Sequence, residues 1–325
     1  MKNIAVLMGG YSSECEISLR SGAVVTNALD KSLYRCYPIS ILENGWFYTD
    51  NDGNKYIIDK NDFSINVGGE KVTFDCCYNT IHGTPGEDGK IQAYLELLGI
   101  PQTSCGSYES AITFNKRDCL AVLQPWEITT GEHIYLNEHD DIDLDKIIAR
   151  VGLPFFVKAN RSGSSYGVSK VYSKEEMPAA LDFAFKVDHQ VIVESYLEGM
   201  EVSVAVYRSH GEIKSFPPTE IVTDNDFFDY EAKYEGKSTE ITPARISEDE
   251  LKELQQISIK IYRVLQLDGI ARADFIYHKG IPHFIEMNTN PGMSKESIVP
   301  QQITASGSSL TKILTEVIED AINRK

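Results

Sequence analysis

Apolar and polar positions along the first third of the chain predict strands and helices in alternation. The apolar run IAVLM at residues 4–8 ends at two glycines, and a helical pattern follows directly. A strand that leads into a helix is typical of a parallel sheet. The last helical pattern of this part stops at Gly99, with Pro101 just beyond, so we expect the unit to end near Cys105. The predicted elements are strands at 4–8, 36–41, 46–50 and 72–80 and helices at 16–29 and 87–99.

The rest of the chain predicts a second pattern, in which strands lie next to longer loops. One helix is expected over residues 109–124, and an acidic surface loop at 137–146 follows it. Two strands then flank a loop of small residues at 160–167, which predicts an antiparallel flap. Further helices are expected where Ser and Glu have the spacing of a cap, at Ser173 with Glu176 and at Ser247 with Glu250, and from Ser309 to the end.

Residues 271–293 predict a β-hairpin whose apolar strands carry four polar side chains. Because successive side chains point to opposite faces of a strand, the polar residues of each strand share one face. The apolar residues between them face a core, so the polar face borders a cleft or solvent. These polar residues are Arg272 and Asp274 on the first strand and Glu286 and Asn288 on the second.

The turn of this hairpin decides whether the two polar faces coincide. A two-residue turn at Lys279-Gly280 would set Asp274 opposite Ile285. A loop with an odd number of residues sets Asp274 opposite Glu286 instead, and we expect that loop and that register. Two facing carboxylates destabilise a sheet unless a cation lies between them, so the hairpin predicts a metal site. Such oxygen ligands suit Mg²⁺, which leaves coordination places for substrate phosphates.

Three glycine-containing loops are candidates for phosphate binding. The loop at 160–167 follows Lys158, whose charge could neutralise a polyphosphate under the backbone amides. HGTPGEDG at 82–89 ends at a helix start, and Gly9-Gly10 follows the first strand. None of them has the Walker or the dinucleotide pattern. Taken alone, the loop at 160–167 is more often a simple hairpin turn, and the other two are weak signals. Together with the acidic hairpin and a candidate adenine strand at 191–202, they predict a nucleotide site.

Composition limits the partners and the compartment. The chain has 325 residues, enough for two or three domains, and 31 basic against 48 acidic residues give a net charge of −17. Such a charge repels nucleic acid and anionic membrane surfaces, so we expect neither as a partner. The six cysteines have no paired metal-binding spacing and are expected to be reduced. The first apolar run is too short for a signal peptide or a membrane span, which predicts a cytoplasmic protein.

The ordered set of motifs resembles the D-alanine-D-alanine ligase family of the ATP-grasp superfamily over nearly the whole chain. The resemblance implies an α/β (α+β) fold with three parts: a parallel-sheet N-terminal domain at 1–105, a central lobe at 106–198 and a C-terminal catalytic lobe at 199–325, with ATP enclosed by the two lobes. The matching segments are GGYSSECEISL, HGTPGEDGKIQAYLELLGIP, NK, VKANRSGSSYGVSKV, FFDYEAKY, ARADFIY, EMNTNPGM and SIVP.

The resemblance also implies which residues bind ATP and Mg²⁺ or Mn²⁺. Lysines would contact the phosphates, serines of the flap loop would cover them, and one strand would meet the adenine and the ribose. The expected phosphate contacts are Lys116, Lys158, Ser164, Ser165 and Lys233; the adenine contacts are Glu194 and Leu197; the ribose contact is Glu201; the metal ligands are Asp274, Glu286 and Asn288.

The amino-acid contacts follow in the same way. Glu14 would bind the ammonium group of the first D-alanine, with His82 nearby, and Ser297 and the Ile298 amide would bind the carboxylate of the second. ATP would phosphorylate the first carboxylate, and the second amine would attack the acyl phosphate. The groups expected to stabilise the anionic intermediate are Arg272 and the Gly292 amide, and those expected to form a closing network are Tyr234, Glu14 and Ser164.

The second substrate stays open at this point. D-Alanine is expected, because Tyr234 ends the segment YEAKY, whose Tyr, Lys and Tyr residues D-lactate ligases lack in this family. D-Serine or D-lactate ligases and other ATP-grasp carboxylate-amine ligases are alternatives. An NAD-dependent oxidoreductase is disfavoured, since LMGGYSS has no third glycine. The resemblance suggests a homodimer. The sequence departs from the family pattern at Leu120, where a lysine is common, and at QPWEITT, where GIP is usual.

Overall fold

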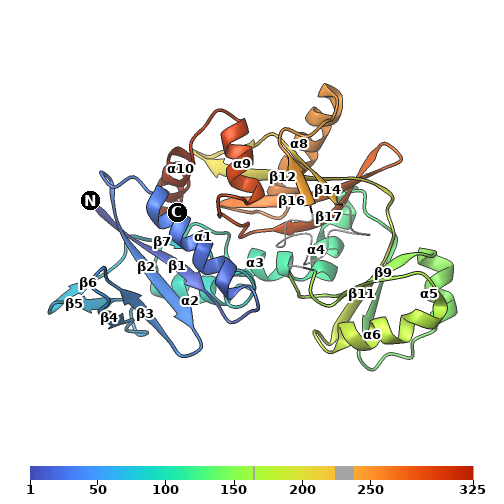
Figure 1. The fold of residues 1–325 in the computed structure, drawn as a ribbon, viewed down its shortest axis with the longest axis horizontal. Coiled ribbons are helices and arrows are strands. Elements are labelled where there is room, and N and C mark those ends of the chain that lie inside the picture. Colours follow the sequence, from blue (N-terminus) through green and yellow to red (C-terminus); the bar gives the residue numbers. More distant parts are fainter. Residues whose placement is uncertain (164, 224–237, 325) are drawn as a thin grey trace.

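A computed structural model describes residues 1–163, 165–223 and 238–324, and these residues form three large sheets (Figure 1). The N-terminal sheet and the C-terminal helices lie at one end of the molecule, and the central sheet lies at the other. The larger C-terminal sheet lies between them. Within the described residues, no helix is long and apolar enough to cross a membrane.

The N-terminal sheet has a parallel centre, as the sequence predicts, and an antiparallel edge. Its strand order is β4-β3-β2-β1-β7, and β1 runs parallel to both β2 and β7. The expected strand at 72–80 is shorter in the structure, because residues 70–72 pair in a separate small hairpin. The elements are β1 (Lys2–Gly9), α1 (Cys15–Ala28), β2 (Tyr34–Leu42), β3 (Gly45–Thr49), β4 (Lys55–Ile57), β5 (Ile65–Val67), β6 (Glu70–Val72), β7 (Cys76–Asn79) and α2 (Lys90–Leu98).

The central sheet is antiparallel and contains the predicted flap. Its order is β10-β9-β11-β8, and the loop at 160–167 joins β9 to β10. The Ser173 side chain makes no cap hydrogen bond, so the cap predicted there is wrong; a 3₁₀ turn precedes the helix instead. The elements are β8 (His133–Asn137), α5 (Leu144–Val151), β9 (Phe155–Ala159), β10 (Val168–Val171), η2 (Lys174–Glu176), α6 (Met177–Phe185) and β11 (Gln190–Ser195).

The C-terminal sheet carries the polar hairpin. Its order is β15-β14-β12-β16-β17, with β13 also paired to β12. The capping box predicted at Ser247 and Glu250 is present at the start of the long helix. The elements are β12 (Gly199–Ser209), β13 (Glu212–Ser215), β14 (Thr219–Thr223), β15 (Ser238–Ile241), α8 (Glu248–Val264), β16 (Ile270–His278), β17 (Ile281–Asn288), α9 (Ile298–Ala305) and α10 (Leu310–Asn323).

The single helix expected over 109–124 is wrong, because the chain forms two helices there. Helix α3 (Ser107–Phe114) and helix α4 (Lys116–Leu123) are separated by Asn115, whose backbone is extended. The Asn115 side chain accepts a hydrogen bond from the Asp118 amide and so caps α4. A cap residue inside a periodic apolar pattern therefore turns the chain and aims Lys116 toward the flap loop, where Nζ donates to the Ser162 carbonyl at 2.7 Å.

The buried cores cross the sequence boundaries expected from the motifs. Apolar residues of β1, β7, α9 and α10 share one core, so the two ends of the chain pack together. Cys119, Leu120 and Leu123 of α4 pack with the core of the C-terminal sheet. The central sheet and helices α5 and α6 have a core of their own. The division at residues 105 and 198 stays a prediction.

Candidate active site

The hairpin of β16 and β17 has the predicted register for a different reason. Asp274 lies opposite Glu286, but the turn is the two-residue one at Lys279-Gly280, so the expected odd loop is wrong. A β-bulge supplies the extra residue, because pairing shifts by one between Phe275 and Asp274 and leaves Ile285 unpaired in the ladder. Bulges often re-aim side chains next to active sites, and this bulge brings Glu286 across from Asp274.

Each hairpin carboxylate has a cationic side chain beside it. Arg272 donates to both Asp274 oxygens at 2.8 and 2.7 Å, and Ser203 Oγ donates to the same carboxylate at 2.5 Å. Lys116 Nζ lies 3.3 Å from Glu286 Oε2. The facing carboxylates are thus stabilised by side-chain cations of the protein. The sequence analysis expected a metal ion to supply this positive charge.

The donor set of the hairpin nevertheless fits a hard divalent cation. Two carboxylates lie opposite one another, and Asn288 lies opposite Arg272 two residues further along β17. Oxygen ligands of this kind suit Mg²⁺. No cluster of three or more His, Cys, Asp or Glu side chains with metal-binding geometry occurs in residues 1–163, 165–223 and 238–324. A metal here would therefore need oxygen from Asn288 and from a substrate.

Two cavities border the hairpin and share one wall. The larger has a volume of about 380 Å³ and lies between the N-terminal loops and the hairpin. The smaller, of about 140 Å³, lies between the central and C-terminal sheets. The wall common to both consists of Lys116, Ser162, Arg272 and Glu286. Two ligands in these cavities would therefore meet between two cations, a carboxylate and the flap loop.

The smaller cavity combines an ion pair with apolar walls. Lys158 Nζ lies 2.5 Å from Glu194 Oε2, and both side chains are mostly buried. Burial alone would lower the pKa of Lys158, but Glu194 and the carboxylates of Glu286 and Glu201 outweigh it and raise that pKa above its ordinary value. The lysine therefore stays charged. The other expected nucleotide contacts that line this cavity are Ser165, Leu197, Glu201 and Asp274.

The larger cavity places Glu14 and His82 beside the flap loop. Glu14 is buried, and a Cβ atom on Gly163 would lie 2.8 Å from its Oε2, so the loop passes directly against this carboxylate. Burial lowers the pKa of His82; the nearby Glu14 carboxylate opposes that shift, and Arg272 adds to it. His82 Nε2 lies 3.4 Å from Ser21 Oγ. The imidazole is therefore neutral at pH 7 and acts as a polar wall.

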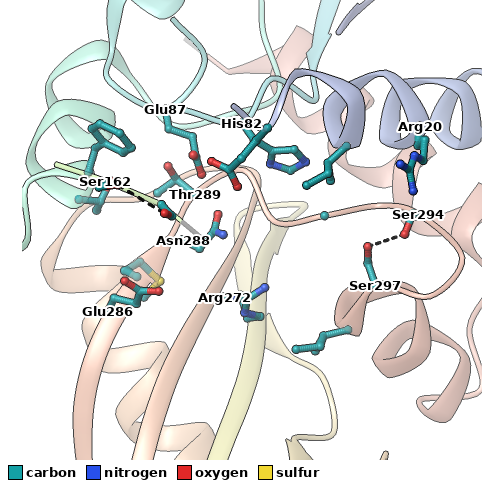
Figure 2. Close-up of a pocket in the computed structure, with 18 of the residues that line it drawn as sticks. Arg20, His82, Glu87, Ser162, Arg272, Glu286, Asn288, Thr289, Ser294 and Ser297 are labelled. Carbon is teal, nitrogen blue, oxygen red and sulfur yellow. Dashed lines mark hydrogen bonds between the residues drawn. The ribbon is translucent and has the colours of Figure 1, made fainter. Parts of the chain in front are cut away.

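Figure 2 shows this cavity, in which Arg272 lies across from Ser297 at the start of α9. Ser297 is the residue before α9, and its Oγ lies 2.9 Å from Ser294 Oγ. A Cβ atom on Gly292 would lie 2.7 Å from Ser297 Oγ, so a side chain at this position would displace the Ser297 hydroxyl. Gly292, Ser297 and Ile298 all line the cavity. Backbone amides at this helix start could bind a carboxylate.

Every described residue that the sequence suggested for the site lines one of the two cavities. Their individual roles stay predictions. Ser164, Lys233 and Tyr234 lie outside the described residues, and so does most of the expected closing loop at 224–238.

The sequence interpretation missed four charged residues that line the larger cavity, Arg20, Glu87, Glu240 and Glu296. Glu87 is buried, and its Oε2 accepts a hydrogen bond from the Gly83 amide at 2.6 Å. Burial raises the pKa of Glu87 to about 8, with Glu14 and Glu286 adding to the effect. Burial likewise raises the pKa of Glu240. The signal for Glu87 was its place inside HGTPGEDG, which we interpreted through its glycines alone.

Comparison with known proteins places the chain in a family. Residues 3–105 match the family described as D-ala D-ala ligase N-terminus, and residues 119–319 match D-ala D-ala ligase C-terminus. The D-alanine--D-alanine ligase of Flavobacterium johnsoniae is 54% identical over 98% of this chain and 99% of its own length. That of Christiangramia forsetii is 52% identical over 100% of this chain and 99% of its own.

Solved structures agree with these matches. The VanG D-Ala:D-Ser ligase of Enterococcus faecalis superposes with a TM-score of 0.88 at 30% identity, covering 98% of both chains. The D-alanine--D-alanine ligase of Bacillus anthracis complexed with ATP gives 0.78 at 28% identity over 100% of this chain and 98% of that one. On the sequence matches and on this ATP-grasp architecture, the chain belongs to the D-alanine-D-alanine ligase family.

Proposed function

We propose that this protein uses ATP to join two D-alanine molecules into D-alanyl-D-alanine, the dipeptide needed for peptidoglycan synthesis. The observation that carries the proposal is the wall shared by the two cavities, Lys116, Ser162, Arg272 and Glu286. A ligase of this kind must bring a nucleotide phosphate and an amino-acid carboxylate together away from water. The family membership of the chain supports the same reaction.

The smaller cavity is the proposed nucleotide site. Leu197 and Phe156 supply apolar surface for a base, and Glu201 on β12 is placed for the ribose hydroxyls. The charged Lys158 and Lys116 are proposed to bind the phosphates, with Ser165 of the flap loop above them. Ser164 and Lys233 are proposed as further phosphate contacts on the basis of the family resemblance.

Asp274, Glu286 and Asn288 are proposed to hold Mg²⁺ or Mn²⁺. Such an ion, when bound, would neutralise charge on the nucleotide phosphates. Binding would require Arg272 and Lys116 to give up part of their contact with these carboxylates. Arg272 would then be available for the anion that develops during amide formation.

The larger cavity is the proposed site for both amino acids. Glu14 and the neutral His82 would orient the ammonium group of the first D-alanine. Ser297 and the Ile298 amide would bind the carboxylate of the second, so that its amine points at the activated carbonyl. Arg272 and the Gly292 amide would stabilise the resulting oxyanion, and Tyr234 is proposed to join Glu14 and Ser164 in closing the site.

Compartment, oligomeric state and partners complete the proposal. The enzyme is proposed to be cytoplasmic and a homodimer, and to bind neither nucleic acid nor membranes. D-Serine is a second candidate acceptor, because the VanG D-Ala:D-Ser ligase superposes closely on this chain. D-Lactate is the third.

A product assay tests the proposal. Purified protein is incubated with Mg-ATP and D-alanine, alone or with D-serine or D-lactate, and products are weighed by mass spectrometry while ADP is measured. D-Alanyl-D-alanine and ADP should appear in equal amounts, and L-alanine should give neither. ADP without dipeptide would point to a nucleotide hydrolase, and no ADP release on addition of amino acid would point to a nucleotide-binding regulatory protein. A mixed dipeptide or depsipeptide as the main product would change the acceptor.

A further inference from the structure

The side-chain amide of Gln302 makes a two-point contact with a β-strand inside the molecule. Gln302 lies on α9 and has no exposed surface. Its Oε1 accepts from the Ala205 amide at 2.9 Å, and its Nε2 donates to the Ser203 carbonyl at 2.8 Å. Nε2 also donates to Thr219 Oγ1 at 3.0 Å. All hydrogen-bonding capacity of this amide except one lone pair is thus used within the protein.

The contact fills a gap in the C-terminal sheet. Strand β12 pairs with β14 as far as Ser203, and it pairs with β13 from Val206 onward. Between these residues the strand changes partner, so the Ser203 carbonyl and the Ala205 amide face α9 rather than a neighbouring strand. Unpaired backbone groups buried in this way would cost stability, and the Gln302 amide replaces the missing strand.

The two residues that Gln302 binds lie next to the proposed reaction centre. In the pairing of β12 with β16, Ser203 is opposite Asp274 and Ala205 is opposite Arg272. Ser203 also donates from Oγ to Asp274 at 2.5 Å. The helix that carries Gln302 begins at Ile298, directly after Ser297, and both of these residues line the larger cavity. Gln302 therefore joins the start of α9 to the strand beside Arg272 and Asp274.

We propose that Gln302 is a positioning residue, which sets the distance between the acceptor-carboxylate site at Ser297 and Ile298 and the oxyanion site at Arg272. The proposal rests on the function proposed above. An amine that attacks an activated carbonyl must be held in near-attack geometry, and a shift of about 1 Å can cost up to about a hundredfold in rate. The apolar face of α9, with Val299 and Ile303 in the core, fixes the packing of the helix but not its register along β12.

The variant Gln302→Met tests this proposal, because methionine has a similar length but cannot pair with Ser203, Ala205 or Thr219. Initial rates of ADP release over a wide range of D-alanine concentrations give one constant for each D-alanine. The KM for the second D-alanine should rise about tenfold or more and kcat should fall. The KM for ATP and the affinity for Mg-ADP should stay within about twofold, because Gln302 does not line the nucleotide cavity.

The control variant Ile303→Val removes one buried methylene group from the same helix. Ile303 is 1% exposed and packs in the shared core, so the variant should lower Tm without changing the ratio of the two D-alanine constants. Equal effects of Gln302→Met and Ile303→Val on that ratio would overturn the proposal, since the role of Gln302 would then be structural alone.

Hydrogen–deuterium exchange adds a readout that does not depend on activity. In Gln302→Met, exchange should rise at the Ala205 amide and also at the amides of Ile298, Val299 and Gln301. A rise confined to Ala205 would contradict the proposed link between strand and helix. If the unmodified protein releases no ADP in the presence of D-alanine, the proposed function fails, whereas the exchange result still decides whether Gln302 couples the two elements.

Discussion

Two lysines of the site each pair with a carboxylate from another segment of the chain. Lys116 on α4 lies beside Glu286 on β17, and Lys158 on β9 lies beside Glu194 on β11. The sequence motifs named these residues individually, but nothing in the spacing indicated that they would neutralise one another. That pairing depends on the tertiary structure, which brings α4 under the flap loop.

Replacing Glu286 by glutamine should lower kcat/KM for D-alanine by about 10²- to 10³-fold, because the charge next to Lys116 and the proposed metal is lost while the shape is kept. Tm should change by no more than about 3 °C, since the residue faces a cavity. Coupled-assay kinetics and thermal unfolding give both values. Glu253→Gln, on the exposed part of α8, is the matched control; full activity of Glu286→Gln would remove the metal assignment.

The raised pKa of Glu87 predicts that the stability of the folded protein depends on pH. Its pKa is raised from 4.5 to about 8 in the folded protein, so the folded state binds more protons than the unfolded chain between these values. The stabilising effect of the proton is complete below about pH 4.5 and is lost as the pH rises toward 8. The wild-type protein should therefore lose stability over this range because of Glu87.

Glu87→Gln removes that cost and keeps an oxygen for the Gly83 amide. Its Tm should exceed that of the wild type by on the order of 5 °C at pH 8 and by little at pH 5. Thermal unfolding at the two pH values measures the difference, and the exposed Glu175→Gln serves as control. A gain of the same size at both pH values would show that ionisation of Glu87 is not the cause.

At the scale of elements, local sequence patterns predicted which helices and strands exist better than they predicted where those elements break or how they are joined. The capping box at Ser247 depends on residues three positions apart, and the sequence contains all of it. The bulge at Ile285 brings a carboxylate to the cleft, and a rule based on turn length does not predict a bulge within a strand. The break at Asn115 was missed because its neighbours keep a helical period across two helices.

Ser247→Ala should lower the stability of the protein by about 1 kcal/mol, because it removes the side-chain cap of α8. Tm should fall by about 2 to 4 °C. The kinetic constants should not change at temperatures well below Tm, since α8 contributes no residue to either cavity. Thermal unfolding and steady-state rates test both parts. A large loss of turnover would mean that α8 positions the hairpin beneath it.

At the scale of the whole molecule, the central sheet and helices α5 and α6 share a core of their own, while Ile192 of β11 packs in the core of the C-terminal sheet. The smaller cavity lies where the central sheet meets the C-terminal sheet, so a ligand there contacts both. The order of the sequence motifs, through the family resemblance, predicted a nucleotide site between these two parts. The shared core between β1 and the C-terminal helices was not predictable, because the residues are about 300 positions apart and no local pattern links them.

Hydrogen–deuterium exchange should therefore resolve two units. Without ligand, amides of β8 to β11 should exchange faster than those of β1, β2 and β12. Mg-ADP at about 100 times its Kd should slow exchange in the central sheet by an amount near 2.7 kcal/mol, because the ligand bridges two units. Uniform protection along the chain, with or without nucleotide, would indicate one cooperative unit instead.

The ion pairs of the site also imply that nucleotide and metal promote the binding of each other. A triphosphate that binds Lys116 and Lys158 displaces their carboxylates, and these carboxylates then need another positive charge. A divalent ion bound without nucleotide would compete with Arg272 for the Asp274 carboxylate, so positive charge would then be in excess there. Binding of both satisfies all groups at once, so each should tighten the other by about 1 to 3 kcal/mol. Calorimetric titration of ATP with magnesium and with a chelator would show this mutual dependence as a difference in affinity, and equal affinities would rule it out.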